Sequence, residues 1–368
     1  MNGRKRLTAI LHKQPADGLA WTTLVDDATL GALPEALRGM SGIDFYRHLG
    51  CDIFLLNGWG AAHDFRSPTL QWPAGVSEVI TVTDGRERRE LRTPDGTLTS
   101  ARQGLMPIEY YVKTVCDVGL YRELWQNARF VEQDDTVAFR EINTLIGDDG
   151  VVTRFCPESA IPRLLEFDMG TEGFYYLLHD HPAEMELLIA TIHARELEAF
   201  EILARGPCDT LILCENTSTF YISPEIYRRY NGPHVRDFVD AVHRAGKTAL
   251  IHMCGHVHDI LHLIRQTGLD GVHALTPPPT GDTPWELALD VLGEDLVILG
   301  VLDPTIWITG SIEDIPAALD ALYTPRLRRA HFCLWPAADG IAVPLERFEA
   351  VAAWMNRQQT ATRIRKGE

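Results

Sequence analysis

The feature that most constrains the fold is a series of eight short apolar runs, most of which end in a polar residue. Segments with helical spacing separate the runs, and strands that alternate with helices form a parallel sheet. The runs occupy residues 19–25, 51–56, 150–155, 209–214, 247–252, 270–274, 296–302 and 330–334. Eight such units predict an α/β fold of the (β/α)8 TIM-barrel type, in which catalytic groups lie at the carboxyl ends of the strands.

One segment, residues 76–103, departs from this alternation. The turn sequences Asp84-Gly85 and Pro94-Asp95-Gly96 lie on either side of the charged, alternating run 86–92. The pattern predicts a β-hairpin or meander that is inserted into the barrel and flanks its mouth. No linker, low-complexity tract or internal repeat interrupts the chain, so we expect residues 1–368 to form a single domain.

Charge and composition exclude several classes of protein. The net charge of −17 argues against binding to nucleic acid or to an anionic membrane, because both need a basic face. No apolar run approaches the roughly 20 residues of a membrane span, and no signal-like apolar segment opens the chain. The seven cysteines are scattered and odd in number, which is typical of reduced thiols in a cytoplasmic protein.

The richest pattern in the chain is a histidine and a cysteine at the end of the fifth run. His252 and Cys254 are two residues apart, so on a strand both side chains point to one face. An imidazole and a thiolate on one face form half of a zinc site. Cys333, in the eighth run, is the predicted third ligand, and Glu215 either completes the site or orients the ligands. The alternative is a buried thiol beside a hydrogen-bonded histidine, with Cys333 as a core cysteine.

Two further strand ends carry residues that can handle protons. Asp303 follows the seventh run and could serve as a general base or orient a histidine ligand, as Glu215 could. Because Pro304 follows it, Asp303 could equally cap a helix. His273 near the end of the sixth run either points into the site or is a satisfied core histidine.

Three residues in strand-end loops are candidates for substrate binding. Asp26 follows the first run, Trp59 follows the second, and Tyr221 lies beyond the fourth. An aromatic ring in such a loop can line a pocket, although aromatic residues more often belong to the core.

Several motifs resemble those of the uroporphyrinogen decarboxylase superfamily, nearly from end to end. They are an opening helix at 4–13, Ile222-Ser223-Pro224-Glu225, His252-Met253-Cys254-Gly255, Gly300-Val301-Leu302-Asp303-Pro304 and Val343-Pro344-Leu345-Glu346-Arg347-Phe348. The His-x-Cys-Gly element is similar to that of the corrinoid-dependent methyltransferase branch. This resemblance implies a zinc-bearing barrel that moves a methyl group between a small compound and the cobalt of a separate corrinoid protein.

The chain departs from the family pattern in two places. The arginine- and glycine-rich segment with which the haem-pathway decarboxylases hold substrate carboxylates is absent, since residues 21–31 contain no arginine and only Gly31, which speaks against a tetrapyrrole substrate. The methyltransferases carry their third zinc cysteine at a position that matches Ala337 or Ala338, about four residues beyond Cys333. Either Cys333 substitutes, or Glu215 completes the site with His252 and Cys254, or the zinc site is lost.

Three hypotheses follow. The first is a zinc-dependent methyltransferase, for example a demethylase of methoxylated or methylated compounds, in which Glu215 or Asp303 manages protons and cobalamin comes only from a partner corrinoid protein. The second is a decarboxylase, in which Asp26 or Asp303 stabilises a protonated intermediate. The third is a binding barrel without catalytic activity. The oligomeric state is open, with a homodimer as one option.

Overall fold

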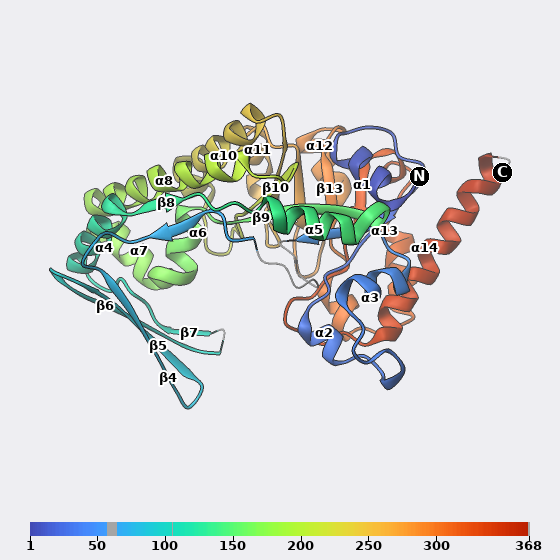
Figure 1. Ribbon diagram of the computed structural model, residues 1–368. Helices are drawn as coiled ribbons and strands as arrows, with labels where there is room; N and C mark the ends of the chain where they lie inside the picture. The colour runs from blue at the N-terminus through green and yellow to red at the C-terminus, as the bar shows by residue number, and fades with distance from the viewer. Residues whose placement is uncertain (57–64, 105, 367–368) are drawn as a thin grey trace.

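An eight-stranded parallel sheet forms the centre of the protein (Figure 1). A computed structural model describes residues 1–56, 65–104 and 106–366. In sheet order the strands are β1 (Ala20–Trp21), β14 (His331–Leu334), β13 (Val297–Gly300), β12 (Gly271–Leu275), β11 (Thr248–His252), β10 (Thr210–Cys214), β9 (Gly150–Glu158) and β2 (Ile53–Leu56). The sheet curls, so that the N–H of Asp52, next to β2, donates to the carbonyl of Trp21 over 2.9 Å. The predicted series of eight parallel strands is confirmed, and the fold is TIM-barrel-like.

Helices connect the strands and cover the outside of the sheet (Figure 1). The α-helices are α1 (Gly3–Leu11), α2 (Asp27–Gly31), α3 (Gly42–Leu49), α4 (Val115–Asn127), α5 (Thr136–Ile146), α6 (Ala160–Arg163), α7 (Gly170–Asp180), α8 (Pro182–Arg205), α9 (Pro224–Ile226), α10 (Gly232–Arg244), α11 (Leu261–Arg265), α12 (Trp285–Leu292), α13 (Asp314–Leu322) and α14 (Leu345–Lys366). Shorter helical turns are η1 (Glu35–Leu37), η2 (Gly147–Asp149), η3 (Leu164–Asp168), η4 (Tyr227–Asn231), η5 (His258–Ile260), η6 (Thr305–Thr309) and η7 (Leu327–Arg329). In the described parts of the chain, we find no helix with the length and apolar character that crossing a membrane would require.

Two apolar clusters stabilise this arrangement. One fills the inside of the curled sheet, where Leu7 and Ile10 of α1 pack with Leu299 and Cys333. Since α1 also contacts β1, β2, β9 and β14, it closes the amino end of the sheet. The second cluster lies between the sheet and the outer helices and includes the fully buried Trp285. Burial of apolar side chains on both sides explains why the strands are apolar along their whole length.

Antiparallel strands lie outside the central sheet. β3 (Thr69–Gln71) pairs with β8 (Arg129–Val131), and β4 (Ser77–Thr83), β5 (Arg86–Thr93), β6 (Gly96–Gln103) and β7 (Met106–Glu109) form a four-stranded sheet. Leu91 and Leu98 of this second sheet are buried. Figure 1 shows the sheet projecting from the body beneath α4 and α7, far from both chain termini. The predicted site residues lie instead on the parallel strands and in the loops that follow them.

Candidate active site

Neighbouring strands bring several of the predicted site residues to one edge of the sheet. At the end of β10, Cys214 is in register with His252 of β11, and His252 is in register with His273 of β12. The backbone N–H groups of Glu215 and Asn216 both donate to the carbonyl of His252, over 3.2 and 3.1 Å. The polar residues that were far apart in the sequence therefore share the carboxyl edge, as predicted for a fold of this type.

The backbone is strained at two points of this edge. Asn216 and Ala274 adopt the left-handed region, with φ of 42° and 66°. Ala274 lies where the register between β12 and β13 shifts. A left-handed conformation is unfavourable for a residue with a Cβ atom and is often found at functional sites.

The two histidines form a hydrogen-bonded pair. The Nδ1 atoms of His252 and His273 are 2.8 Å apart, so one ring donates and the other accepts. Phe155 packs edge-on against His252, and the ring of Trp335 lies 4.1 Å from that of His273. Burial lowers the pKa of His252 to about 4 and that of His273 well below its usual value, so both rings are neutral near pH 7. His252 is partly exposed, whereas His273 is completely buried and positions His252. The predicted catalytic role of His273 is not supported.

Glu215 lies beneath the surface of the edge. Its side chain is completely buried and accepts hydrogen bonds from Ser159 Oγ over 2.6 Å and from Asn231 Nδ2 over 2.7 Å. Burial raises the pKa of Glu215 to about 8, so the carboxyl is largely protonated at neutral pH. Ser159 and Asn231 enclose this carboxyl, which has no exposed surface, and the predicted catalytic and metal-binding roles of Glu215 are therefore not supported by its position.

The accessible chemistry at this edge belongs to Cys254 and Glu166. Cys254 is exposed to solvent, yet enough protein surrounds its thiol for burial, with a smaller effect of the Glu166 charge, to raise its pKa. Glu166 comes from η3 and accepts a hydrogen bond from Asn216 Nδ2 over 3.3 Å. Burial raises the pKa of this carboxyl to about 7. A partly exposed carboxyl that titrates near neutral pH can give or take a proton during a reaction.

Sequence reasoning missed Glu166 because it does not lie at a strand end. It occurs in Leu164-Leu165-Glu166-Phe167, a run that the helical turn η3 folds back toward β10. The only signal in the sequence is a single acid within an apolar run, and such an acid either faces solvent or has a specific partner.

Asp303 has a structural role. One carboxylate oxygen accepts from the backbone N–H and the hydroxyl of Thr305, and the other accepts from the N–H of Thr280 over 2.8 Å. Although burial opposes ionisation, these hydrogen bonds lower the pKa of Asp303. The side chain thus starts η6 and ties it to the loop after β12. The helix-cap interpretation is supported, and a role as general base is not.

Two of the three predicted substrate-binding residues are described. Asp26 caps α2 by accepting from the N–H of Thr29, and its other oxygen accepts from the N–H of Gly340 over 2.7 Å, which ties the loop after β14 to α2. Tyr221 is partly exposed, and its hydroxyl donates to the carbonyl of Asn216 beside Glu166. Tyr221 therefore lies at the site and Asp26 serves the scaffold, while Trp59 lies outside the described residues.

The predicted zinc ligands do not come together. Cys333 is buried in the apolar cluster with α1, and the charges of Asp52 and Arg6 near the amino end of the sheet act on its thiol. In the described residues, no three His, Cys, Asp or Glu side chains are grouped so that they could hold a metal ion. Because a catalytic zinc needs three protein ligands, the residues described do not fit the predicted site, and the choice of Cys333 is corrected.

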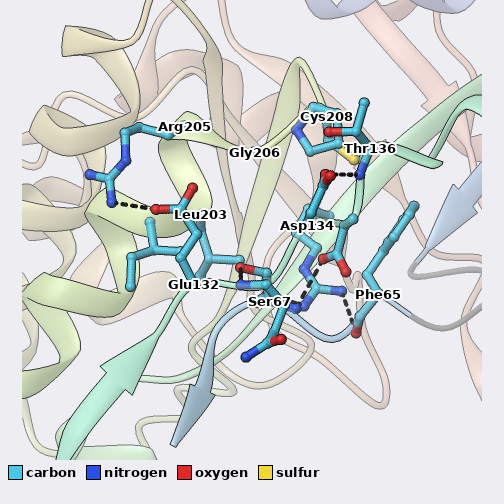
Figure 2. Close-up of a pocket in the computed structure, with 14 residues that line it drawn as sticks. Phe65, Ser67, Glu132, Asp134, Thr136, Leu203, Arg205, Gly206 and Cys208 are labelled. Carbon is cyan, nitrogen blue, oxygen red and sulfur yellow. Dashed lines mark hydrogen bonds and ion pairs between the residues drawn. The ribbon is translucent and has the colours of Figure 1, made fainter. Parts of the chain in front are cut away.

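A separate hollow lies beside the amino end of β10 and contains none of the predicted site residues (Figure 2). Its volume is about 420 Å³, and Phe65, Arg154 and Cys208 contribute to its lining. Figure 2 shows Arg205 at its edge bonded to Glu132, over 3.0 Å. The Arg154 guanidinium donates to the backbone carbonyl of Phe65 and lies over its ring. The polar groups of this hollow thus hold the connecting segments in place.

The fold and the position of these groups define a barrel-like α/β protein with a candidate site at the carboxyl edge of its parallel strands. The chain belongs to the uroporphyrinogen decarboxylase family, since the model of that family, described as uroporphyrinogen decarboxylase (URO-D), matches residues 166–356. This span begins at Glu166 and includes His252, Cys254 and Asp303. The family resemblance of the sequence motifs is thereby confirmed. No curated protein sequence matches the chain.

Solved structures resemble the chain over most of its length. A methyltransferase from Methanosarcina mazei matches with a TM-score of 0.60 and 14% identity, and the alignment covers 97% of this chain and 99% of that chain. At this identity the similarity concerns the fold alone. A 2,3-dimethylmalate lyase of the PEP mutase/isocitrate lyase superfamily matches with a TM-score of 0.37 and 13% identity, covering 100% of this chain and 89% of that chain. That structure is too different to inform the site.

Proposed function

We propose that the chain is a methyltransferase that moves a methyl group between a small methylated or methoxylated compound, or a thiol, and a separate corrinoid protein. Family membership supports the proposal, as does the end-to-end similarity of fold to a methyltransferase. The observation that carries it is the pair of Cys254 and Glu166, an accessible thiol and a carboxyl titrating near neutral pH at the edge where barrels hold their catalytic groups.

Methyl transfer needs a proton to move with each turnover. When a methyl group leaves a methoxylated compound, the carbon–oxygen bond breaks and the oxygen takes up a proton. When a methyl group moves onto a thiol, the sulfur–carbon bond forms and the thiol loses its proton. Glu166 can act in either direction because the pKa of its carboxyl is about 7. The amide of Asn216 holds Glu166, and Tyr221 in turn donates to the carbonyl of Asn216.

The partner's corrinoid would supply the group that gives or accepts the methyl, and the partner would have to cover the mouth of the barrel. Exposed apolar side chains follow four of the strands at this edge: Phe167 after β9, Phe220 after β10, Ile312 after β13 and Ile341 after β14. Large exposed apolar side chains around a site favour contact with another protein. Phe220 is the most exposed, at 79%, and its ring packs on His256.

Zinc is a separate question, because the described residues do not provide a three-ligand site. We expect purified protein to contain well below one zinc per chain, even after zinc is supplied under reducing conditions. Elemental analysis of the wild type, Cys254→Ser and Cys333→Ser tests this expectation. About one zinc per chain, lost in both variants, would show that Cys333 does reach the site and would contradict the arrangement described above.

The proposed activity is tested with a reconstituted corrinoid partner and a panel of methoxylated and methylated donors, by following the absorption spectrum of the cobalt. We expect a spectral change with at least one donor. Glu166→Gln should slow the change about 100-fold, because a positioned acid or base contributes on the order of 10² or more. Glu172→Gln is the matched control, since Glu172 is exposed on α7 close by. No spectral change with any donor, or a full rate for Glu166→Gln, would contradict the proposal.

A decarboxylase is the second candidate, and the name of the matching family favours it. Glu166 could then protonate the carbanion left when carbon dioxide departs. Glu158 ends β9, Glu166 lies beyond it in η3 and Asp303 follows β13, and negative charge on these carboxyl groups disfavours a substrate with many carboxylates. Release of carbon dioxide from a small acid, without any corrinoid partner, would favour this candidate over methyl transfer.

A further inference from the structure

Five ionisable residues, three of them buried and two partly exposed, lie in the wall of the protein, between the parallel sheet and the helices α8 and α10. They form what we name the wall cluster: Arg163 of α6, Asp168 of η3, His193 and Glu196 of α8, and His234 of α10. The side chain of Glu196 is only 5% exposed, and Asp168 and His234 are also buried. None of these residues takes part in the proposed reaction.

Glu196 is the centre of the cluster, but its contacts are loose. One carboxylate oxygen is 3.7 Å from Arg163 Nε, and the other is 3.9 Å from His193 Nδ1. Both distances exceed a direct hydrogen bond. In the described part of the chain, neither oxygen of Glu196, nor Arg163 Nε, nor His193 Nδ1 has a hydrogen-bond partner. Buried water molecules commonly satisfy polar atoms that lack a direct partner in the protein.

The same is true of the flanking residues. Asp168 Oδ2 and His234 Nδ1 are buried without a hydrogen-bond partner among the described residues. The rings of His193 and His234 stack with their centroids 3.7 Å apart. Burial raises the pKa of Asp168 to about 6, whereas burial and the neighbouring His193 keep His234 neutral. These groups provide acceptors and donors for several water molecules.

The wall cluster connects the candidate site with the outer surface. On the inner side, Arg163 lies 3.8 Å from Glu158 at the end of β9, and the charge of Glu158 acts on Glu166. On the outer side, His193 Nε2 is 2.8 Å from Asp237 of α10, whose side chain is 45% exposed. Ionisable groups within 4 Å of one another therefore run from Glu158 at the end of β9 to solvent beyond α10, and Glu166 at the mouth lies near enough to Glu158 to interact with its charge.

We propose that the wall cluster, bridged by bound water, conducts protons between the candidate site and the solvent outside α10. The proposal rests on the proposed function, because a corrinoid protein that covers the mouth would separate Glu166 from bulk water there. Each methyl transfer releases or takes up one proton, and this proton then passes by way of Glu158, Glu196, His193 and Asp237. Arg163 forms long ion pairs with both Glu158 and Glu196 and carries no proton itself.

The charged residues around Glu196 and His193 favour proton transfer along this path. Glu196 is faced by Arg163 from α6 at 3.7 Å and by His193 from its own helix at 3.9 Å, and Asp168 from η3 and the largely protonated Glu215 after β10 lie near enough to interact with it. Although burial opposes it, the carboxylates of Glu196 and Asp237 raise the pKa of His193. An imidazole that binds a proton near neutral pH can both accept and release it during turnover.

The kinetic test compares the rate with the corrinoid protein, which would cover the mouth of the barrel, and the rate with free methylcobalamin, which would leave the mouth open to solvent. Glu196→Gln keeps the shape of the side chain and removes its ionisation, and Glu198→Gln is the matched control, since Glu198 on the same helix forms an exposed ion pair with Arg195. The rate is measured with the corrinoid protein and, separately, with free methylcobalamin and a thiol. We expect Glu196→Gln to slow only the first reaction, by about tenfold or more. An unchanged rate with the corrinoid protein, or equal slowing of both reactions, would overturn the proposal.

A second measurement does not depend on activity. A high-resolution crystal structure should show water between Glu196 and both Arg163 and His193, and an NMR titration should show a lower pKa for His193 in Glu196→Gln than in the wild type. Absence of water at these positions overturns the proposed path. If the path is found but the wild type transfers no methyl group with either corrinoid form, the proposed function has failed, and with it the role of the path in methyl transfer.

Discussion

The buried carboxyl of Glu215 predicts an unusual dependence of stability on pH. Glu215→Gln keeps the size of the side chain, and Gln can still accept from Asn231 while its amide donates to Ser159 Oγ. The substitution removes the proton equilibrium alone. In the native protein burial raises the pKa of Glu215 from 4.5 to about 8. Ionising Glu215 therefore costs about 5 kcal/mol more in the native protein than in the unfolded chain, since each pKa unit is worth about 1.4 kcal/mol.

The sign follows from the proton balance. Between about pH 4.5 and pH 8 the native protein keeps the Glu215 proton, whereas the unfolded chain loses it. The stabilising effect of Glu215 is therefore complete below pH 4.5 and is lost as the pH rises through 8. The free energy of unfolding should fall by up to about 1.4 kcal/mol per pH unit in this window. As the pH rises from about 4.5 to about 7.5, the free energy of unfolding of Glu215→Gln should therefore increase relative to that of the wild type, by on the order of 3 to 4 kcal/mol.

The assay is urea unfolding of the wild type and the variant, followed by tryptophan fluorescence, from about pH 5 to about pH 8. Glu225→Gln is the control, because Glu225 is exposed on α9 and its substitution should leave the pH profile unchanged. Parallel profiles for the wild type and Glu215→Gln would refute the reasoning. They would mean that Glu215 ionises in the native protein as readily as in the unfolded chain.

Three other substitutions test the description of the site. Glu166→Gln should speed alkylation of Cys254 by iodoacetamide at about pH 8 by roughly threefold, because a negative charge near the thiol is removed; peptide mass spectrometry measures the rate. Cys333→Ala should lower the free energy of unfolding by about 1 to 2 kcal/mol, because a buried side chain is shortened, and should leave the alkylation of Cys254 unchanged. A variant as stable as the wild type would argue against the buried position of Cys333. Asp303→Asn should cost about 1 to 3 kcal/mol in urea unfolding, because one of its two accepting oxygens is lost; an unaffected midpoint would contradict the cap.

Much of the architecture was determined by the sequence. Short apolar runs bounded by polar residues specify strands that are buried on both faces, and all eight lie within a few residues of the predicted ranges. Because parallel strands share one carboxyl edge, the sequence also placed His252, Cys254 and Tyr221 in the region of the site. The family followed from motifs such as His252-Met253-Cys254-Gly255.

The roles of individual side chains were decided only by the tertiary structure. Cys333 ends a run as His252 does, but its side chain packs against α1 inside the sheet, and the spacing of residues does not report this depth. Glu215 follows a strand as a catalytic acid would, yet Ser159 and Asn231 enclose it completely. Local sequence specifies where a strand ends, whereas burial and charge depend on which distant segments cover that end. For the same reason the partnership of Glu166 with Asn216, 50 residues apart in the sequence, exists only in the folded chain.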